Sequence, residues 1–159
     1  ESRGDEVRKG RDMRNVGWLA AGVVMLMGSA ACSRQPEFQL IGSIHEIMEG
    51  AVAPPAEVVW GSISTIVDAD GIHEKQPQTD QEWEIVEHAA IALAESGNLL
   101  LMEGRTQDGK WVEYVQDMIR TSVMARDAAR EKNAGQVLEA GEVIYNACTG
   151  CHQSYITEQ

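Results

Sequence analysis

The chain has 159 residues, of which 43% are hydrophobic and 5% aromatic, and its formal net charge at pH 7 is −12. This length allows one domain with a hydrophobic core and no more. From Glu37 onward there are 21 acidic and 7 basic residues, so we expect repulsion from nucleic acids and from anionic membrane surfaces. The same charge would attract a redox partner with a basic docking surface, although acidic helical surfaces are equally typical of proteins in which they only confer solubility.

The first 31 residues are organised as an export signal. Residues 1–12 are charged and have no apolar periodicity, so we interpret them as an upstream extension before Met13. Residues 13–31 have the pattern of a secretory signal peptide, in which Arg14 precedes the apolar run Val16–Met27 and small residues follow. This run is shorter than the roughly 20 residues that span a bilayer comfortably. The sequence therefore predicts a periplasmic protein.

A cysteine follows the signal directly. The segment from Ser29 to Cys32 resembles a bacterial lipobox, with serine where leucine is usual. Lipidation of Cys32, which would add a membrane anchor, and ordinary cleavage after Ala31 both remain open. Residues 32–36 would then be a short tether in front of the folded domain.

The domain begins with apolar residues at helical spacing. They recur at three- and four-residue steps from Phe38 to Met48, which predicts an amphipathic helix. Ala53–Pro55 interrupts this pattern, because proline lacks the amide donor. A second helical piece is expected from Pro55 to Val67, and the pattern leaves open whether the two pieces form one kinked helix. Asp68–Pro77 contains an Asp-Gly pair and is expected to be a solvated loop.

Three further helices are expected. Thr79–Glu82 has the sequence of a capping box and predicts a helix that runs to about Leu101. The spacing of apolar residues predicts two more helices, Trp111–Ala129 and Val137–Tyr155. Because no segment shows the alternation of a strand, residues 37–159 are expected to form an all-α, antiparallel up-and-down four-helix bundle.

The last predicted helix contains Cys148-Thr149-Gly150-Cys151-His152. C-x-x-C-H is the attachment signature of a c-type haem, in which two thiols bind the porphyrin and the histidine binds the iron. In a helix, Cys148, Cys151 and His152 fall at i, i+3 and i+4 and share one face. A zinc site would need a second cysteine or histidine pair, and a thioredoxin-like dithiol would need a βαβ setting, so both alternatives are disfavoured.

The longer pattern Gly141-x-x-x-Tyr145-x-x-Cys148-x-x-Cys151-His152-x-x-Tyr155 resembles the cytochrome c′ family, whose members are up-and-down four-helix bundles. The resemblance implies one covalent haem c on Cys148 and Cys151, with His152 as the proximal iron ligand. Small residues would leave room for the porphyrin between helices: Gly141, Ala147, Ala89, Ala90, Ala92 and Ala94.

The resemblance also implies that the first helix faces the sixth position of the iron. By its order in the chain, Met48 is the residue that best meets this position, and in low-spin relatives a methionine fills it. His45 lies three residues earlier on nearly the same face and is the alternative ligand. Met48 could also be ordinary core packing, since methionines on apolar helical faces usually are.

These observations favour a monohaem one-electron carrier. The alternatives are a five-coordinate protein that binds nitric oxide or carbon monoxide, and a non-haem helical lipoprotein whose cysteines form a disulfide. No Ser/His/Asp set and no Gly-rich phosphate loop is present, so an enzyme is not expected. Similar proteins are commonly homodimers, but no residue here requires one.

Overall fold

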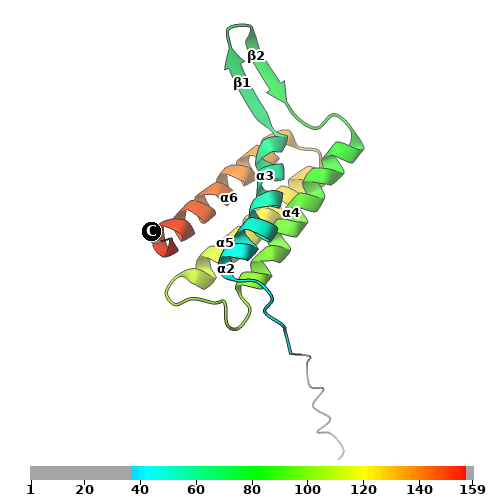
Figure 1. Ribbon diagram of the computed structural model, residues 1–159. Helices are drawn as coiled ribbons and strands as arrows, with labels where there is room; N and C mark the ends of the chain where they lie inside the picture. The colour runs from blue at the N-terminus through cyan, green and yellow to red at the C-terminus, as the bar shows by residue number, and fades with distance from the viewer. Residues whose placement is uncertain (1–36, 157–159) are drawn as a thin grey trace, which may run out of the picture. The chain divides into compact units, whose positions relative to one another are not determined.

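Residues 37–156 are described by a computed structural model, and these residues are mostly helical, with four helical stretches and one pair of short strands (Figure 1). The predicted extension, signal peptide and tether, including Cys32, lie outside the described residues. Among the helices described, none combines the length and the apolar content needed to cross a membrane.

The first helix begins at Ile44, six residues later than the apolar spacing predicted. Ser43 caps it. The Ser43 Oγ accepts a hydrogen bond from the N–H of Glu46 at 3.2 Å, and the N–H of Ser43 donates to Glu46 Oε2 at 2.8 Å. This reciprocal capping box fixes where the helix starts. Ile41, which precedes it, is 87% exposed and adds nothing to the buried face.

The two predicted pieces of this helix form one continuous helix. It consists of α2 (Ile44–Ile47), the π-helical segment η1 (Met48–Val52) and α3 (Ala53–Ser62). Pro54 and Pro55 stand in the first turn of α3 and have no N–H to donate to the carbonyls one turn earlier. The turn before them is wider than an α-helical turn, and Ala53 donates to the carbonyl oxygen of Met48. The prolines are therefore accommodated by a π segment, a feature that often occurs at functional sites.

A β-hairpin follows where helix and loop were predicted. Strand β1 (Ser64–Asp68) pairs antiparallel with β2 (Gly71–Lys75). The expectation of an all-α fold with a helix to Val67 was wrong at this point. Thr65–Val67 are three consecutive β-branched residues, which lose side-chain freedom in a helix and favour a strand. Gly71, with φ of 134°, accepts the backbone conformation that the tight turn requires.

The remaining helices agree with the predicted ones to within a few residues. They are α4 (Asp80–Leu100), α5 (Trp111–Arg130) and α6 (Ala134–Tyr155). The predicted capping box of α4 is confirmed: Thr79 Oγ1 accepts from the N–H of Glu82 at 3.2 Å, and the N–H of Thr79 donates to Glu82 Oε2 at 2.9 Å.

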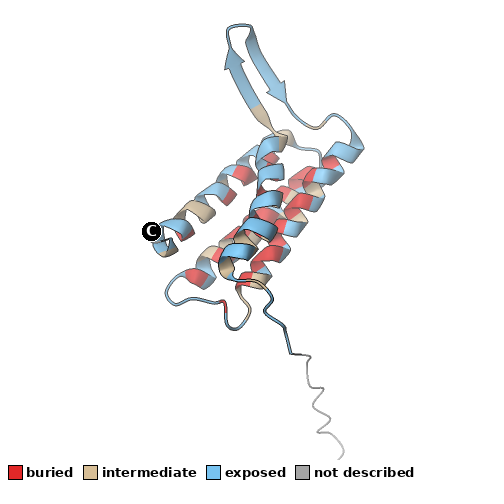
Figure 2. Cartoon of the chain, in the orientation of Figure 1, coloured by how far each residue is buried: buried red, intermediate tan, exposed pale blue. Residues whose placement is uncertain are grey.

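Helices that follow one another in the chain pack side by side. The first helix packs against α4, α4 along α5, and α5 along α6, whereas the first helix and α6 contact each other little (Figure 1). Helices that follow one another are also neighbours in an up-and-down bundle, but a closed bundle would in addition pack its first helix along its last. Buried residues face inward from α4, α5 and α6 (Figure 2). The largest fully buried apolar side chains are Leu93, Leu100, Ile144, Val59 and Val137.

Candidate functional site

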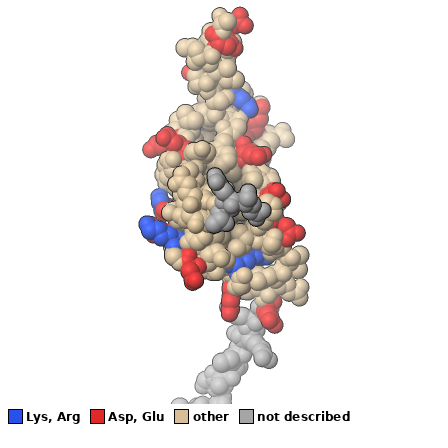
Figure 3. Space-filling model, turned by 60° about the vertical axis from the view of Figure 1, so that its left-hand side comes forward, with Lys and Arg blue, Asp and Glu red and all other residues tan. Residues whose placement is uncertain are grey.

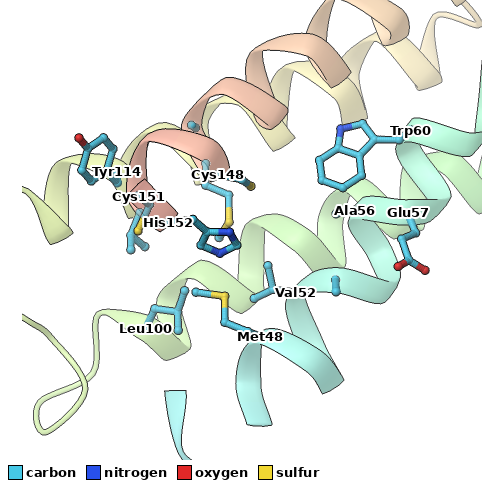
Figure 4. Close-up of a pocket in the computed structure, with 14 residues that line it drawn as sticks. Met48, Val52, Ala56, Glu57, Trp60, Leu100, Tyr114, Cys148, Cys151 and His152 are labelled. Atoms are coloured by element: carbon cyan, nitrogen blue, oxygen red, sulfur yellow. The ribbon is translucent and has the colours of Figure 1, made fainter. Parts of the chain in front are cut away.

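One turn near the end of α6 carries the three residues of the C-x-x-C-H motif. The helix is regular through this turn, so Cys148, Cys151 and His152 share one face, as their spacing predicted. All three line one cavity of about 190 Å³, which Figure 4 shows in close-up. The facing walls include Met48, Val52 and Ala56 of the first helix, Leu100 of α4, and Tyr114 and Val115 of α5.

A second, wider pocket adjoins this cavity. It has a volume of about 510 Å³ and shares Met48, Ala53, Cys151 and His152 with the first. Because the same four residues border both spaces, the two form one region between the first helix and the end of α6. The wider pocket lies within the range of roughly 300–1,000 Å³ typical of ligand and cofactor sites, and the narrower cavity lies below that range. The region between the first helix and the end of α6 therefore has the size of a cofactor site.

The two motif cysteines are free thiols. Cys151 is buried and Cys148 is half-buried. Burial raises the pKa of both thiols, and the nearby Cys151 raises that of Cys148 further. Both sulfurs therefore carry their protons at neutral pH. This disfavours a reactive dithiol, because the thiolate is the form that attacks disulfides.

The structure places the two candidate distal ligands differently. Met48 is half-buried and borders both pockets, and Figure 4 shows it across the cavity from His152. His45 lies at the border of the wider pocket only, and its side chain is 79% exposed. Its Nε2 lies 3.4 Å from Glu49 Oε1. Of the two, Met48 is therefore the one whose side chain faces the space in front of His152.

A second methionine also lines the cavity, and the sequence did not single it out. Met118 of α5 is buried, with only 5% of its surface exposed. Its Cε lies 3.2 Å from where a β-carbon on Gly97 would stand, so the end of the side chain packs against the backbone of α4. Met118 is thus held by core packing, whereas Met48 sits at the junction of the two spaces.

The small residues predicted to make room for a porphyrin have different roles. Ala147 lines the cavity as expected. Gly141 does not line the cavity. A β-carbon at Gly141 would lie 3.3 Å from Cδ1 of Trp60, so this glycine allows α3 and α6 to approach each other. Ala90 is fully buried in the core and Ala92 is exposed, and neither borders the cavity.

The donor atoms at this site suit an iron porphyrin. Within residues 37–156, no group of three or more His, Cys, Asp or Glu side chains comes together in a way that could hold a metal ion unaided. A haem brings four nitrogen ligands of its own and needs from the protein only one or two axial ligands. An imidazole, a facing thioether and two thiols one turn apart on a mostly apolar cavity wall supply what such a group needs. The residues present therefore fit a covalently attached haem.

Several contacts that shape the site were not predicted from the sequence. The Trp60 Nε1 donates to the carbonyl oxygen of Gly141 at 2.9 Å. Tyr114 lies against Gly150, where a β-carbon would be 3.0 Å from its Cε1. Arg105 is buried and binds the chain just before the first helix. All three contacts join residues far apart in the chain, and no local pattern announces them.

Comparison of the chain with protein-family models, with curated proteins and with solved structures gave no match.

Proposed function

We propose that this chain is an exported monohaem c-type cytochrome that carries single electrons; its resemblance to the cytochrome c′ family implies the covalent haem. Cys148 and Cys151 would hold the haem through thioethers, and His152 would bind the iron from α6. The observation that carries the proposal is that the motif lies on one regular helical turn facing an apolar cavity, with Met48 on the opposite wall.

The haem would supply an iron that changes between Fe(III) and Fe(II), and the protein would control its surroundings. His152 and Met48 together would keep the coordination sphere full in both oxidation states. Ligation by histidine and methionine raises the potential relative to two histidines. The apolar walls formed by Val52, Ala56 and Leu100 would exclude water and favour the iron state of lower charge.

The charges around the cavity support a basic redox partner. From residue 37 to residue 74 the sequence has no lysine or arginine, and none occurs after Lys132. The first helix and α6, which border the cavity, therefore carry carboxylates such as Glu49, Glu57 and Glu142 without any lysine or arginine. Figure 3 shows acidic side chains outnumbering basic ones on the face that it displays. A partner with a basic surface would be attracted to this side.

One observation favours a second candidate function. Val52 and Ala56 stand beside Met48 on the same wall and offer no donor atom. If Met48 packs against apolar side chains and does not bind the iron, the sixth position of the iron would face only apolar groups. The protein would then be a five-coordinate haem protein able to bind nitric oxide or carbon monoxide.

The test is expression of the full chain with a bacterial haem-attachment system, followed by absorption spectroscopy and mass spectrometry. We expect a Soret band and a mass increase of one haem that survives denaturation, and Cys148→Ser with Cys151→Ser together should abolish both. A colourless protein with two unmodified thiols would overturn the proposal. High-spin oxidised protein that binds carbon monoxide on reduction would select the second candidate.

A further inference from the structure

Arg105 is buried without a carboxylate partner among the residues described. Only 5% of its surface is exposed. Its Nη2 and Nε donate to the carbonyl oxygen of Gly42 at 2.9 and 3.2 Å, and its Nη1 donates to the carbonyl oxygen of Leu99 at 3.2 Å. A charge removed from water in this way is costly unless its hydrogen bonds are satisfied. The fork of the guanidinium satisfies them by joining Gly42, 63 residues earlier in the chain, to the end of α4.

The Gly42 carbonyl stands directly before the capping box that starts the first helix. Ser43 is the cap residue, and Met48 follows five residues later. Next to Arg105, Gly104 has φ of 89°, and a β-carbon there would lie 2.7 Å from Cδ1 of Leu40. The approach to the helix is thus held twice by the same loop, once through Arg105 and once through packing of Leu40.

The same loop between α4 and α5 also holds the end of α6. The Tyr155 hydroxyl donates to the carbonyl oxygen of Asp108, and its ring packs edge-on against Trp111 at 5.1 Å between centroids. Tyr155 is three residues after His152. One loop therefore anchors both helices that would supply axial ligands, although these two helices contact each other little.

We propose that Arg105 is a positioning residue that holds Met48 at the sixth coordination site of the iron. This inference rests on the proposed haem site. The Arg105 contact fixes the start of α2, and α2 continues without a break into η1, so a shift at Gly42 is carried to Met48. Lysine cannot replace it fully, because a single ammonium lacks the planar fork that donates to two carbonyls at once.

The experiment compares haem-loaded wild type with Arg105→Gln and Arg105→Lys. The readouts are the near-infrared charge-transfer band of a methionine-bound ferric haem, the spin state, and hydrogen exchange of amides 44–52. In Arg105→Gln we expect loss of much of the band, a new high-spin fraction, and exchange about tenfold faster at Ile47, because a hydrogen bond to a charged group is lost. In Arg105→Lys, the band and the exchange rate should lie between those of wild type and those of Arg105→Gln.

Arg126→Gln is the matched control, because Arg126 pairs with Asp127 on α5, away from Gly42. It should leave the band and the exchange unchanged. A wild-type band and wild-type exchange in Arg105→Gln would overturn the inference, as would a wild-type result in Arg105→Lys if the glutamine variant does not fold. If wild type itself lacks the band, Met48 does not bind the iron. The role of Arg105 in positioning the first helix is then judged from amide exchange alone, and unchanged exchange in Arg105→Gln would overturn it.

Discussion

The indole Nε1 of Trp60 donates a hydrogen bond to the main-chain oxygen of Gly141 at 2.9 Å, across 81 residues of chain. This bond joins the far end of the first helix to α6, while the loop that contains Arg105 and Asp108 holds both helices at the other end. The cavity lies between these two connections. The two helices pack little against each other directly, so the contacts at the two ends of the cavity set its width.

The close approach at Gly141 should appear as a coupling energy. Gly141→Ala alone should gain little stability, because the new β-carbon would crowd Trp60 at 3.3 Å. In a Trp60→Ala background, the same change should gain up to about 1 kcal/mol from helix propensity. A double-mutant cycle by urea unfolding measures the difference, and a coupling energy near zero would contradict this account.

Methionine ligation can be tested with a matched pair. Met48→Leu should turn low-spin haem into high-spin haem and abolish the near-infrared band, since leucine has similar bulk and no donor sulfur. Met118→Leu should leave both unchanged, because Met118 packs against Gly97. Absorption and magnetic resonance spectra of the oxidised proteins decide the question. Loss of the band in Met118→Leu instead would move the sixth ligand to α5.

Gly97 sets the distance between α4 and α5. A β-carbon at this position would lie 2.4 Å from Ile119 Cγ1 and 2.9 Å from Cδ1. We expect Gly97→Ala to lower the free energy of unfolding by about 1–3 kcal/mol through overpacking. Gly61→Ala is the control, because no atom lies within 4 Å of the new carbon there. Equal stability of the two variants would show that Ile119 can move aside at no cost.

Acid should weaken the start of α4. Hydrogen bonds from the main-chain amides of Gln78 and Thr79 lower the pKa of Glu82 from its ordinary value of 4.5. A carboxyl with a lowered pKa in the folded state stabilises the protein above its ordinary pKa, and this contribution is lost as pH falls through the folded value. The stability difference between wild type and Glu82→Gln should therefore shrink from pH 7 to pH 3.

Urea unfolding at several pH values measures this difference. Glu139→Gln, a change at an exposed position on α6, should show no comparable narrowing. If the difference in unfolding free energy between wild type and Glu82→Gln stayed constant across this pH range, it would argue against a role for the ionised carboxylate in the cap.

The rate of electron transfer should depend on ionic strength as it does for two reactants of opposite charge. The rate constant with a small cationic oxidant, such as a tris-chelate cobalt(III) complex, should fall as ionic strength rises, because screening weakens attraction. Glu49→Gln with Glu57→Gln should flatten this dependence, whereas Glu131→Gln, at the far end of α5, should not. Stopped-flow measurements with the anion hexacyanoferrate(III) should show the opposite trend, and equal behaviour of the two oxidants would contradict steering by these carboxylates.

Local spacing was sufficient for the features that a single helix determines. The i, i+3, i+4 placement of Cys148, Cys151 and His152 follows from helix geometry alone, and the capping box at Thr79 and Glu82 closes within one turn. The haem that this motif predicts, and the export signal before the domain, remain predictions from the sequence.

Only the tertiary structure decided how the cavity is bounded. The first helix continues past Pro54 because a π segment accommodates the missing donors, and the β-branched run Thr65–Val67 forms a hairpin instead of extending that helix. The positions of Met48 opposite His152 and of Arg105 under Gly42 depend on contacts between segments more than 60 residues apart. Such contacts arise from packing of whole helices, for which residue spacing within one segment carries no signal.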